Sequence, residues 1–304
     1  MSEERIRAEI GRVLMERQLS TGGWPALALS EQTALEPTIY SMLALGAGQE
    51  NGYERALRCL LGCQNPNGSW PSFVGDDGEG TWTTALALIA LADNSEAARS
   101  RRKGFQWLLQ SAGKESSWFW RWKFRTTDRR VRFDSNKFGW PWQPDTNSWV
   151  VPTSFAILAL HHLPRSWAGE VAAFRLQRGT EMLLDRVCPG GGWNAGNGVV
   201  YGAALAPHPD DTAVALLALK NRPDEPAVRE SLAWLDRCVV RLSAPWSLAW
   251  SALALAAHSR CVDRLVSSLA EQLRPNEIRD TATLAVLALA LDGERSLRLL
   301  TVTQ

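Results

Sequence analysis

The chain has 304 residues, of which 45% are hydrophobic and 21% charged, and it contains 15 tryptophans but only three tyrosines. A formal net charge of +1 argues against a nucleic-acid-binding protein, which would carry a basic excess over the whole domain. No apolar run reaches the roughly 18 residues that span a bilayer, and with an odd number of cysteines and no apolar signal region at the N-terminus we expect a protein of the reducing cytoplasm.

Two kinds of predicted helix alternate along the chain. Amphipathic segments, apolar on one face and charged on the other, are typical of half-exposed outer helices. We expect them at 3–17, 53–63, 97–111, 168–186, 225–241 and 260–274. Segments built almost wholly from Ala, Leu and Val must be buried on all sides, and we expect these inner helices at 37–47, 82–93, 151–163, 211–221, 246–258 and 279–292.

Six repeats of an outer and an inner helix predict an all-α repeat protein in which each buried helix needs a neighbour on both sides. An open array would leave the first and the last inner helix bare, and neither has a polar face that could serve as a cap. Closure into an (α/α)6 barrel of six helical hairpins gives every inner helix a neighbour on both sides. We therefore predict that residues 1–304 form a single barrel domain.

The segment 114–149 interrupts this rhythm with aromatic, Gly and Pro residues. Large and basic residues alternate from Trp118 to Arg125, which predicts a short exposed strand or hairpin. The segment also contains Arg129 and Arg130, and a basic, aromatic patch suits an anionic amphiphile, either a diphosphate head group on an isoprenoid tail or a membrane surface. Single-stranded nucleic acid would fit locally, although the net charge argues against it, and a solvated hairpin without a ligand would have the same composition.

Two kinds of short motif resemble a known family. Gln18 with Gly22 and Trp24, and Gln64 with Gly68 and Trp70, resemble the repeated Gln–Trp motifs of squalene-hopene and oxidosqualene cyclases. Gly191-Gly192-Trp193 resembles a third copy without its Gln. Asp210-Asp211-Thr212-Ala213 is similar to the class II terpene cyclase acid motif Asp-x-Asp-Asp-Thr-Ala, with His208 in place of the first Asp. Those cyclases have two barrels, whereas this length provides one.

The resemblance implies that Asp210 is a proton donor that starts the cyclisation of an unsaturated, isoprenoid-type substrate. His208 would then support the donor as an imidazolium, beside Asp211, and the acid step needs neither a metal nor an organic cofactor. An aspartate before a threonine is also a common helix N-cap, which remains the simpler interpretation of Asp211.

Aromatic residues on or next to the inner helices could stabilise carbocations in a cavity that excludes water. The candidates for substrate binding are Tyr40, Trp82, Trp142, Trp149, Phe155, Trp246 and Trp250. Glu36 and Asp76 also precede inner helices and are expected at the same mouth of the barrel as Asp210. By contrast, we expect Trp24, Trp70 and Trp193 to staple one repeat to the next by stacking.

Two functions remain open on the sequence alone. The first is a class II-like cyclase with a hydrophobic substrate and, through 114–149, a peripheral membrane contact. The second is a non-catalytic barrel that binds a lipid or a protein. A zinc site is not expected, because the one Asp-x-Cys pair, Asp236 and Cys238, falls inside an outer helix where residues two apart point in different directions.

Overall fold

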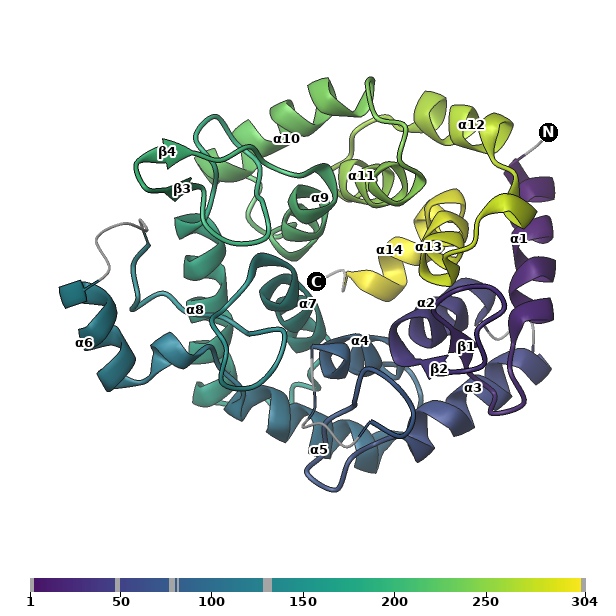
Figure 1. The fold of residues 1–304 in the computed structure, drawn as a ribbon, viewed down its shortest axis with the longest axis horizontal. Coiled ribbons are helices and arrows are strands. Elements are labelled where there is room, and N and C mark those ends of the chain that lie inside the picture. Colours follow the sequence, from purple (N-terminus) through teal and green to yellow (C-terminus); the bar gives the residue numbers. More distant parts are fainter. Residues whose placement is uncertain (1–2, 47–49, 77–79, 81, 128–132, 302–304) are drawn as a thin grey trace.

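Two concentric rings of helices surround one axis (Figure 1). The computed structural model describes residues 3–46, 50–76, 80, 82–127 and 133–301. The outer ring consists of α1 (Glu3–Arg17), α3 (Glu50–Gly62), α5 (Ala98–Gln110), α8 (Glu170–Asp185), α10 (Pro226–Val239) and α12 (Asp263–Gln272). The inner ring consists of α2 (Leu35–Leu45), α4 (Thr83–Ala90), α7 (Val150–His161), α9 (Pro209–Ala218), α11 (Pro245–Ala257) and α13 (Thr281–Leu291).

The inner ring closes, because each inner helix packs on the next and α13 packs on α2. The outer ring closes between α12 and α1. This arrangement confirms the predicted all-α barrel of outer and inner helices. Its core is made by the inner helices, whose Ala, Leu and Val residues are almost all buried. No helix among the described residues is both long and apolar enough to cross a membrane.

Four buried tryptophans tie the outer helices to the inner ones. Each indole nitrogen donates a hydrogen bond to a carbonyl near the end of an outer helix, and each backbone N–H donates to a threonine hydroxyl on an inner helix. For Trp70 the acceptors are the Leu60 carbonyl at 2.8 Å and the Thr84 Oγ1 at 2.9 Å. Trp24, Trp140 and Trp193 bond in the same way to Leu14 and Thr38, to Leu108 and Thr153, and to Leu183 and Thr212.

The two Gln–Trp turns also reach the following repeat. Gln64 Nε2 donates to the carbonyl of Gly68 at 2.9 Å and to that of Ser100, on the next outer helix, at 2.8 Å. Gln18 makes the equivalent pair of bonds to Gly22 and Gly52. The predicted staples are therefore present, but the contacts that the structure shows for them are hydrogen bonds and not the expected ring stacking. Trp140 is a fourth staple that the sequence reasoning missed, although its Gly-Trp dipeptide repeats that of Trp24 and Trp193.

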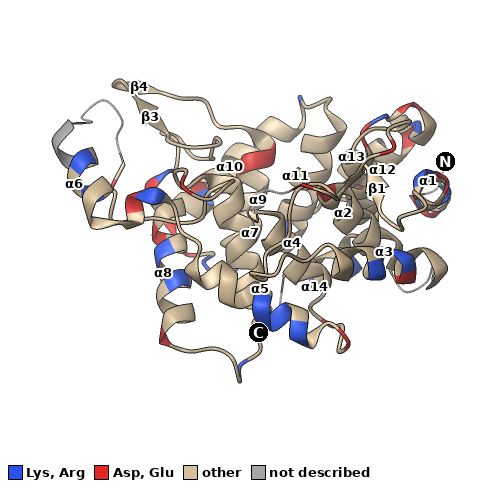
Figure 2. Cartoon of the chain, turned by 60° about the horizontal axis from the view of Figure 1, so that its bottom comes forward, with Lys and Arg blue, Asp and Glu red and all other residues tan. Residues whose placement is uncertain are grey.

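A helix that was not predicted, α14 (Gly293–Leu300), closes the end of the barrel opposite the β3–β4 hairpin (Figure 2). It packs on α2, α4, α11 and α13. Arg295 donates from its guanidinium to the carbonyls of Leu43 and Ala44, and Leu300 is fully buried. The C-terminal ends of the inner helices are therefore covered, and their N-terminal ends form the mouth of the barrel.

The prediction of a strand or hairpin in the insertion is wrong. Residues Trp118–Thr127 form helix α6, preceded by a 3-10 turn at Lys114–Ser116, and α6 stands out from the barrel beside α8 (Figure 1). The alternation of large residues is compatible with a helix because Trp120 and Phe124, four residues apart, share one face. Short strands occur in hairpins between the helices: β1 (Trp24–Pro25) with β2 (Thr33–Ala34), and β3 (Val199–Val200) with β4 (Ala203–Ala204).

Candidate functional site

The inner helices present their side chains to the barrel axis in register. Thr38, Thr84, Thr153 and Thr212 all face outward, because each accepts a hydrogen bond from a stapling tryptophan. A residue two positions before such a threonine lies about 200° further round the helix and therefore faces the axis. On α11 and α13 the corresponding positions are Trp246 and Ala282. The layer at the mouth therefore consists of Glu36, Trp82, Val151, Asp210, Trp246 and Ala282.

We call these six residues the mouth layer. Five of them are half-buried, and Ala282 is the small exception with 7% exposure. The order of the inner helices around the ring places Glu36 on α2 across the axis from Asp210 on α9. In the same way Trp82 on α4 lies across from Trp246 on α11. Two carboxyl groups and two indoles thus occupy opposite walls of the mouth.

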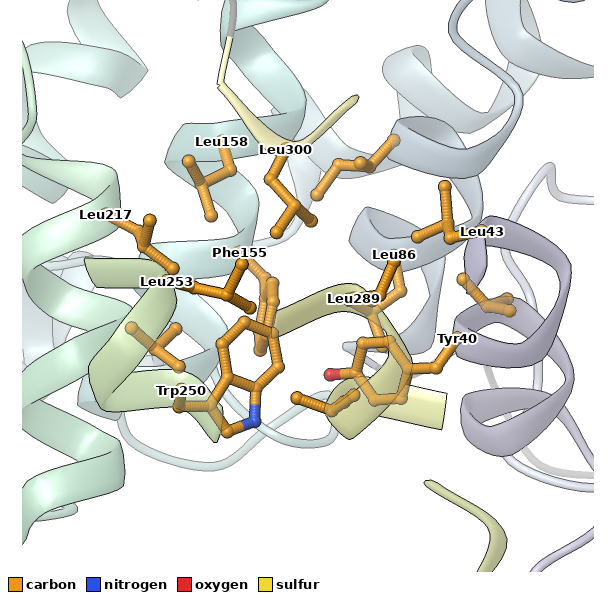
Figure 3. Close-up of a cluster of buried hydrophobic side chains, with 14 of the residues drawn as sticks. Tyr40, Leu43, Leu86, Phe155, Leu158, Leu217, Trp250, Leu253, Leu289 and Leu300 are labelled. Atoms are coloured by element: carbon orange, nitrogen blue, oxygen red, sulfur yellow. The ribbon is translucent and has the colours of Figure 1, made fainter. Parts of the chain in front are cut away.

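Deeper layers fill the barrel axis. Figure 3 shows Tyr40, Phe155 and Trp250 together with leucines from the inner helices and Leu300 from α14. Tyr40 and Trp250 are fully buried, and Phe155 is 1% exposed. These rings form a closed floor beneath the mouth layer, so a ligand that enters from the mouth meets aromatic side chains.

The predicted aromatic residues on the inner helices form one chain of ring contacts. The Trp250 ring centroid lies 5.8 Å from those of Tyr40, Phe155 and Trp246, all at steep edge-to-face angles. Trp82 continues the chain, with its ring 5.7 Å from Phe155 and 4.9 Å from Trp142. The structure therefore brings together six of the seven aromatic residues expected to bind substrate.

Glu36 is the mouth-layer residue with the most perturbed ionisation. Burial and, as the smaller cause, the negative charge of Asp280 together raise the pKa of its carboxyl group to about 7. Asp280 is the N-cap of α13, where its Oδ1 accepts a hydrogen bond from the Thr283 backbone N–H at 2.6 Å. The Glu36 charge in turn adds to the burial that raises the pKa of Tyr40, one turn deeper on α2. A substantial part of Glu36 is therefore protonated at neutral pH.

The acid motif opens helix α9. Because α9 begins at Pro209, Asp210 and Asp211 lie inside its first turn and do not precede the helix. His208 is the N-cap residue, and its Nδ1 lies 2.9 Å from Asp211 Oδ2. The expected partnership of His208 with Asp210 is therefore wrong, since the imidazole pairs with Asp211. The N-cap interpretation of Asp211 is also wrong, since its carboxylate bonds to a side chain.

Asp211 lies deeper than its neighbours. Burial and the negative charge of Asp210 together raise the pKa of Asp211 to about 6, although the hydrogen bond with His208 partly opposes them. Helical geometry turns Asp211 about 100° away from Asp210, and the charge of Asp211 acts on Cys188, in the loop between α8 and α9. Asp210 therefore faces the axis, while Asp211 and His208 stand behind it.

The other predicted residues are not part of the mouth layer or the aromatic chain. Asp76 is exposed in the loop before α4. Trp149 is the N-cap residue of α7, is 36% exposed and contacts Gly196, so it lies outside the aromatic chain. Arg129 and Arg130 fall outside the described residues. Asp280, which acts on Glu36, was not predicted as a site residue, although its place before Thr281 repeats the pattern of Asp211 and Thr212.

The mouth layer offers acid–base groups and aromatic faces. Within the described residues, no cluster of His, Cys, Asp and Glu has the arrangement of a metal site. Two buried polar atoms of the floor, the Tyr40 hydroxyl and the Trp250 Nε1, have no hydrogen-bond partner among the described residues.

Solved structures with the same architecture belong to different enzyme classes. The chain superimposes on the type II terpene cyclase MstE from Scytonema, in complex with its product merosterolic acid A, with a TM-score of 0.62, 15% identity and 97% of each chain covered. It also superimposes on an α-1,6-mannanase from a Salegentibacter species, with a TM-score of 0.65, 9% identity and 97% and 100% of the two chains covered. For a family 8 endoglucanase from Klebsiella pneumoniae the TM-score is 0.60 at 12% identity, with 95% and 99% of the two chains covered.

The chain has the α/α-toroid fold. No family model and no curated protein matches the sequence, so these likenesses show the fold alone.

Proposed function

We propose that the protein is an acid-initiated cyclase of the class II terpene cyclase type, with Asp210 as the proton donor. One observation supports the proposal: by the register of the inner helices Asp210 belongs to the mouth layer, level with Trp82 and Trp246 and above the floor of Tyr40, Phe155 and Trp250. An acid beside aromatic faces is the arrangement that protonation of an alkene needs.

The reaction would transfer the carboxyl proton of Asp210 to one carbon of a substrate double bond. The other carbon becomes a cation, which the π electrons of a second double bond in the same substrate attack to close a ring. Loss of a proton from the final cation completes the cycle and balances the charge. The faces of Trp82, Trp142 and Trp246 would stabilise the cations through their quadrupoles, an effect that increases when water is excluded.

The closed floor restricts how a substrate can bind. Since Tyr40, Phe155 and Trp250 are buried and α14 covers the far end, the substrate would lie in the mouth layer and rest on the floor. An unsaturated, isoprenoid-type hydrocarbon fits this environment, because four of the six mouth-layer side chains are apolar or aromatic. Arg129 and Arg130 remain the proposed contacts for an anionic head group. No metal or organic cofactor takes part in the proposed acid step.

A second candidate, glycoside hydrolysis, is favoured by the opposition of Glu36 and Asp210 across the mouth. Glycosidases use one protonated and one ionised carboxyl group on either side of the scissile bond. With a pKa of about 7, Glu36 would be the acid, since a weak acid that is protonated at neutral pH suits a leaving-group oxygen better than an alkene carbon. Against this candidate, the mouth layer offers few polar groups for sugar hydroxyls.

The test is product analysis after incubation with linear prenyl alcohols, prenyl diphosphates and squalene, and in parallel with α-linked and β-linked oligosaccharides. A cyclic product with the same mass as its substrate that Asp210→Asn abolishes supports the cyclase, since Asn keeps the shape of the side chain and has no acidic proton to transfer. Reducing sugar that Glu36→Gln abolishes supports the hydrolase. Asp76→Asn, at an exposed carboxylate before another inner helix, is the matched control and should keep full activity.

Two outcomes would contradict the assignment of the acid. Full cyclase activity of Asp210→Asn would refute the proton-donor role. Binding of a prenyl substrate without turnover by the unmodified protein would favour the non-catalytic barrel. His208→Ala tests whether His208 supports the catalytic residues without contacting the substrate. Loss of its hydrogen bond to Asp211 should lower kcat and leave substrate binding unchanged, because His208 stands behind the mouth layer.

A further inference from the structure

Helix α6 has two different aromatic faces. Trp120 and Phe124 lie on the inner face, where Phe124 contacts Phe133 with 5.4 Å between the ring centroids. The guanidinium of Arg186, which is 4% exposed at the end of α8, lies 4.2 Å from the Phe133 ring centroid. These contacts attach α6 to the barrel.

The outer face carries more aromatic surface than attachment requires. Trp118, Phe119 and Trp122 are 74%, 49% and 59% exposed. In a helix these three positions fall within an arc of about 100°. Single exposed apolar residues are common on protein surfaces, but adjacent large ones on one helix mark a binding surface.

Positive charge accompanies the outer face. The sequence of α6 contains Arg121, Lys123 and Arg125 and no acidic residue. At about 100° per residue, Arg121 and Lys123 flank the arc of the three outer aromatic residues on its two sides. Lys114 and Lys123 hold their Nζ atoms 4.8 and 4.6 Å from the ring centroid of Trp120 on the inner face. Figure 2 shows α6 as a projection from one side of the barrel, on the side where the β3–β4 hairpin rises. Tyr201, in the turn of that hairpin, is 72% exposed.

We infer that the outer face of α6, formed by Trp118, Phe119 and Trp122, is a docking surface for an anionic lipid bilayer. Indole and phenyl rings insert at the boundary between head groups and acyl chains, while lysine and arginine beside them attract acidic head groups. A second copy of this chain is a poorer occupant, because a two-fold contact through α6 would bring the same positive charges together.

The test is co-sedimentation with vesicles of phosphatidylcholine alone and with vesicles that contain one third phosphatidylglycerol. We expect binding to the anionic vesicles, weakened by salt, and a loss of about tenfold or more in the triple variant Trp118→Ala/Phe119→Ala/Trp122→Ala. Val240→Ala is the matched control, since Val240 is 79% exposed at the end of α10, and it should bind like the unmodified protein. Thermal unfolding of the triple variant should be unchanged, because the inner face of α6 is intact.

Three results would overturn the inference. The first is that the unmodified protein does not bind anionic vesicles. The second is that the triple variant binds them as well as the control does. The third is that the unmodified protein self-associates in ultracentrifugation without binding vesicles and that the triple variant does not, which would make the face a protein interface. None of these readouts depends on cyclase activity, so the docking surface and the proposed function are tested separately.

Discussion

The tryptophan staples allow a stability prediction with an internal control. Thr84 and Thr281 are both fully buried in the first turn of an inner helix. The Thr84 hydroxyl accepts the Trp70 backbone N–H at 2.9 Å, whereas the Thr281 hydroxyl has no hydrogen-bond partner among the described residues. Valine has nearly the shape of threonine, so Thr→Val at either position changes the hydrogen bond without opening a cavity.

The two substitutions are expected to change the free energy of unfolding in different directions. Thr84→Val leaves the buried Trp70 N–H without an acceptor, which should lower the free energy of unfolding by about 1–3 kcal/mol. Thr281→Val replaces an unsatisfied hydroxyl with a methyl group and should leave that free energy unchanged or raise it by up to about 1 kcal/mol. Both residues are β-branched, so helix propensity contributes little to the difference.

Urea denaturation of the two variants, followed by circular dichroism, measures this difference directly. We expect a gap of about 2 kcal/mol between them, with unchanged m-values. Equal effects of the two substitutions, or a Thr84→Val protein as stable as the unmodified one, would show that the staple hydrogen bond does not hold the outer and inner helices together.

Three further predictions concern the mouth, the closed end and the turns. Because the pKa of Glu36 is raised from 4.5 to about 7, the folded protein keeps a proton between these pH values that the unfolded chain loses. The stabilisation of the fold by this proton is complete below about pH 4.5 and is lost as the pH rises through about 7, so Glu36→Gln should flatten the dependence of the free energy of unfolding on pH between about pH 5 and pH 8, measured by denaturation at a series of pH values. Leu300→Ala, which empties a fully buried position of α14, should lower the free energy of unfolding by about 2–5 kcal/mol, and a smaller loss would show that α14 does not fill the end of the barrel. Gly68 has a φ of +97°, and an added Cβ would lie 2.5 Å from the Lys103 carbonyl oxygen, so Gly68→Ala should lower the melting temperature by several degrees, whereas Gly62→Ala, which meets no atom within 4 Å, should not.

Much of the architecture could be predicted from periodicity. A helix without polar residues can only be buried, and buried helices that alternate with amphipathic ones require two layers. The aromatic chain around Tyr40, Phe155 and Trp250 could be predicted for the same reason, because those residues lie on the inner helices. The strand prediction at Trp118 failed because alternating large residues satisfy a period of two as well as the spacing of four that joins Trp120 to Phe124.

The pairing of charges could not be predicted in this way. His208 stands two residues before Asp210 and three before Asp211, and only the rotation of a helix that begins at Pro209 decides that the imidazole reaches Asp211. The raised pKa of Glu36 likewise depends on Asp280, which is 244 positions away in the sequence and comes close only because α13 packs on α2. Neither the pairing of His208 with Asp211 nor the effect of Asp280 on Glu36 can be recognised from the residues that are adjacent in the sequence.

Burial and helical period are properties of each segment, so the two rings of helices, their order and the residues of the inner ring follow from the sequence alone. What closes the barrel and what meets at its mouth depend on how the helices pack in three dimensions. α14 covers the end because ring closure leaves an apolar opening that Leu300 can fill. Glu36 and Asp210 face each other because they belong to inner helices three places apart in a ring of six, and this relation exists only once the ring has closed.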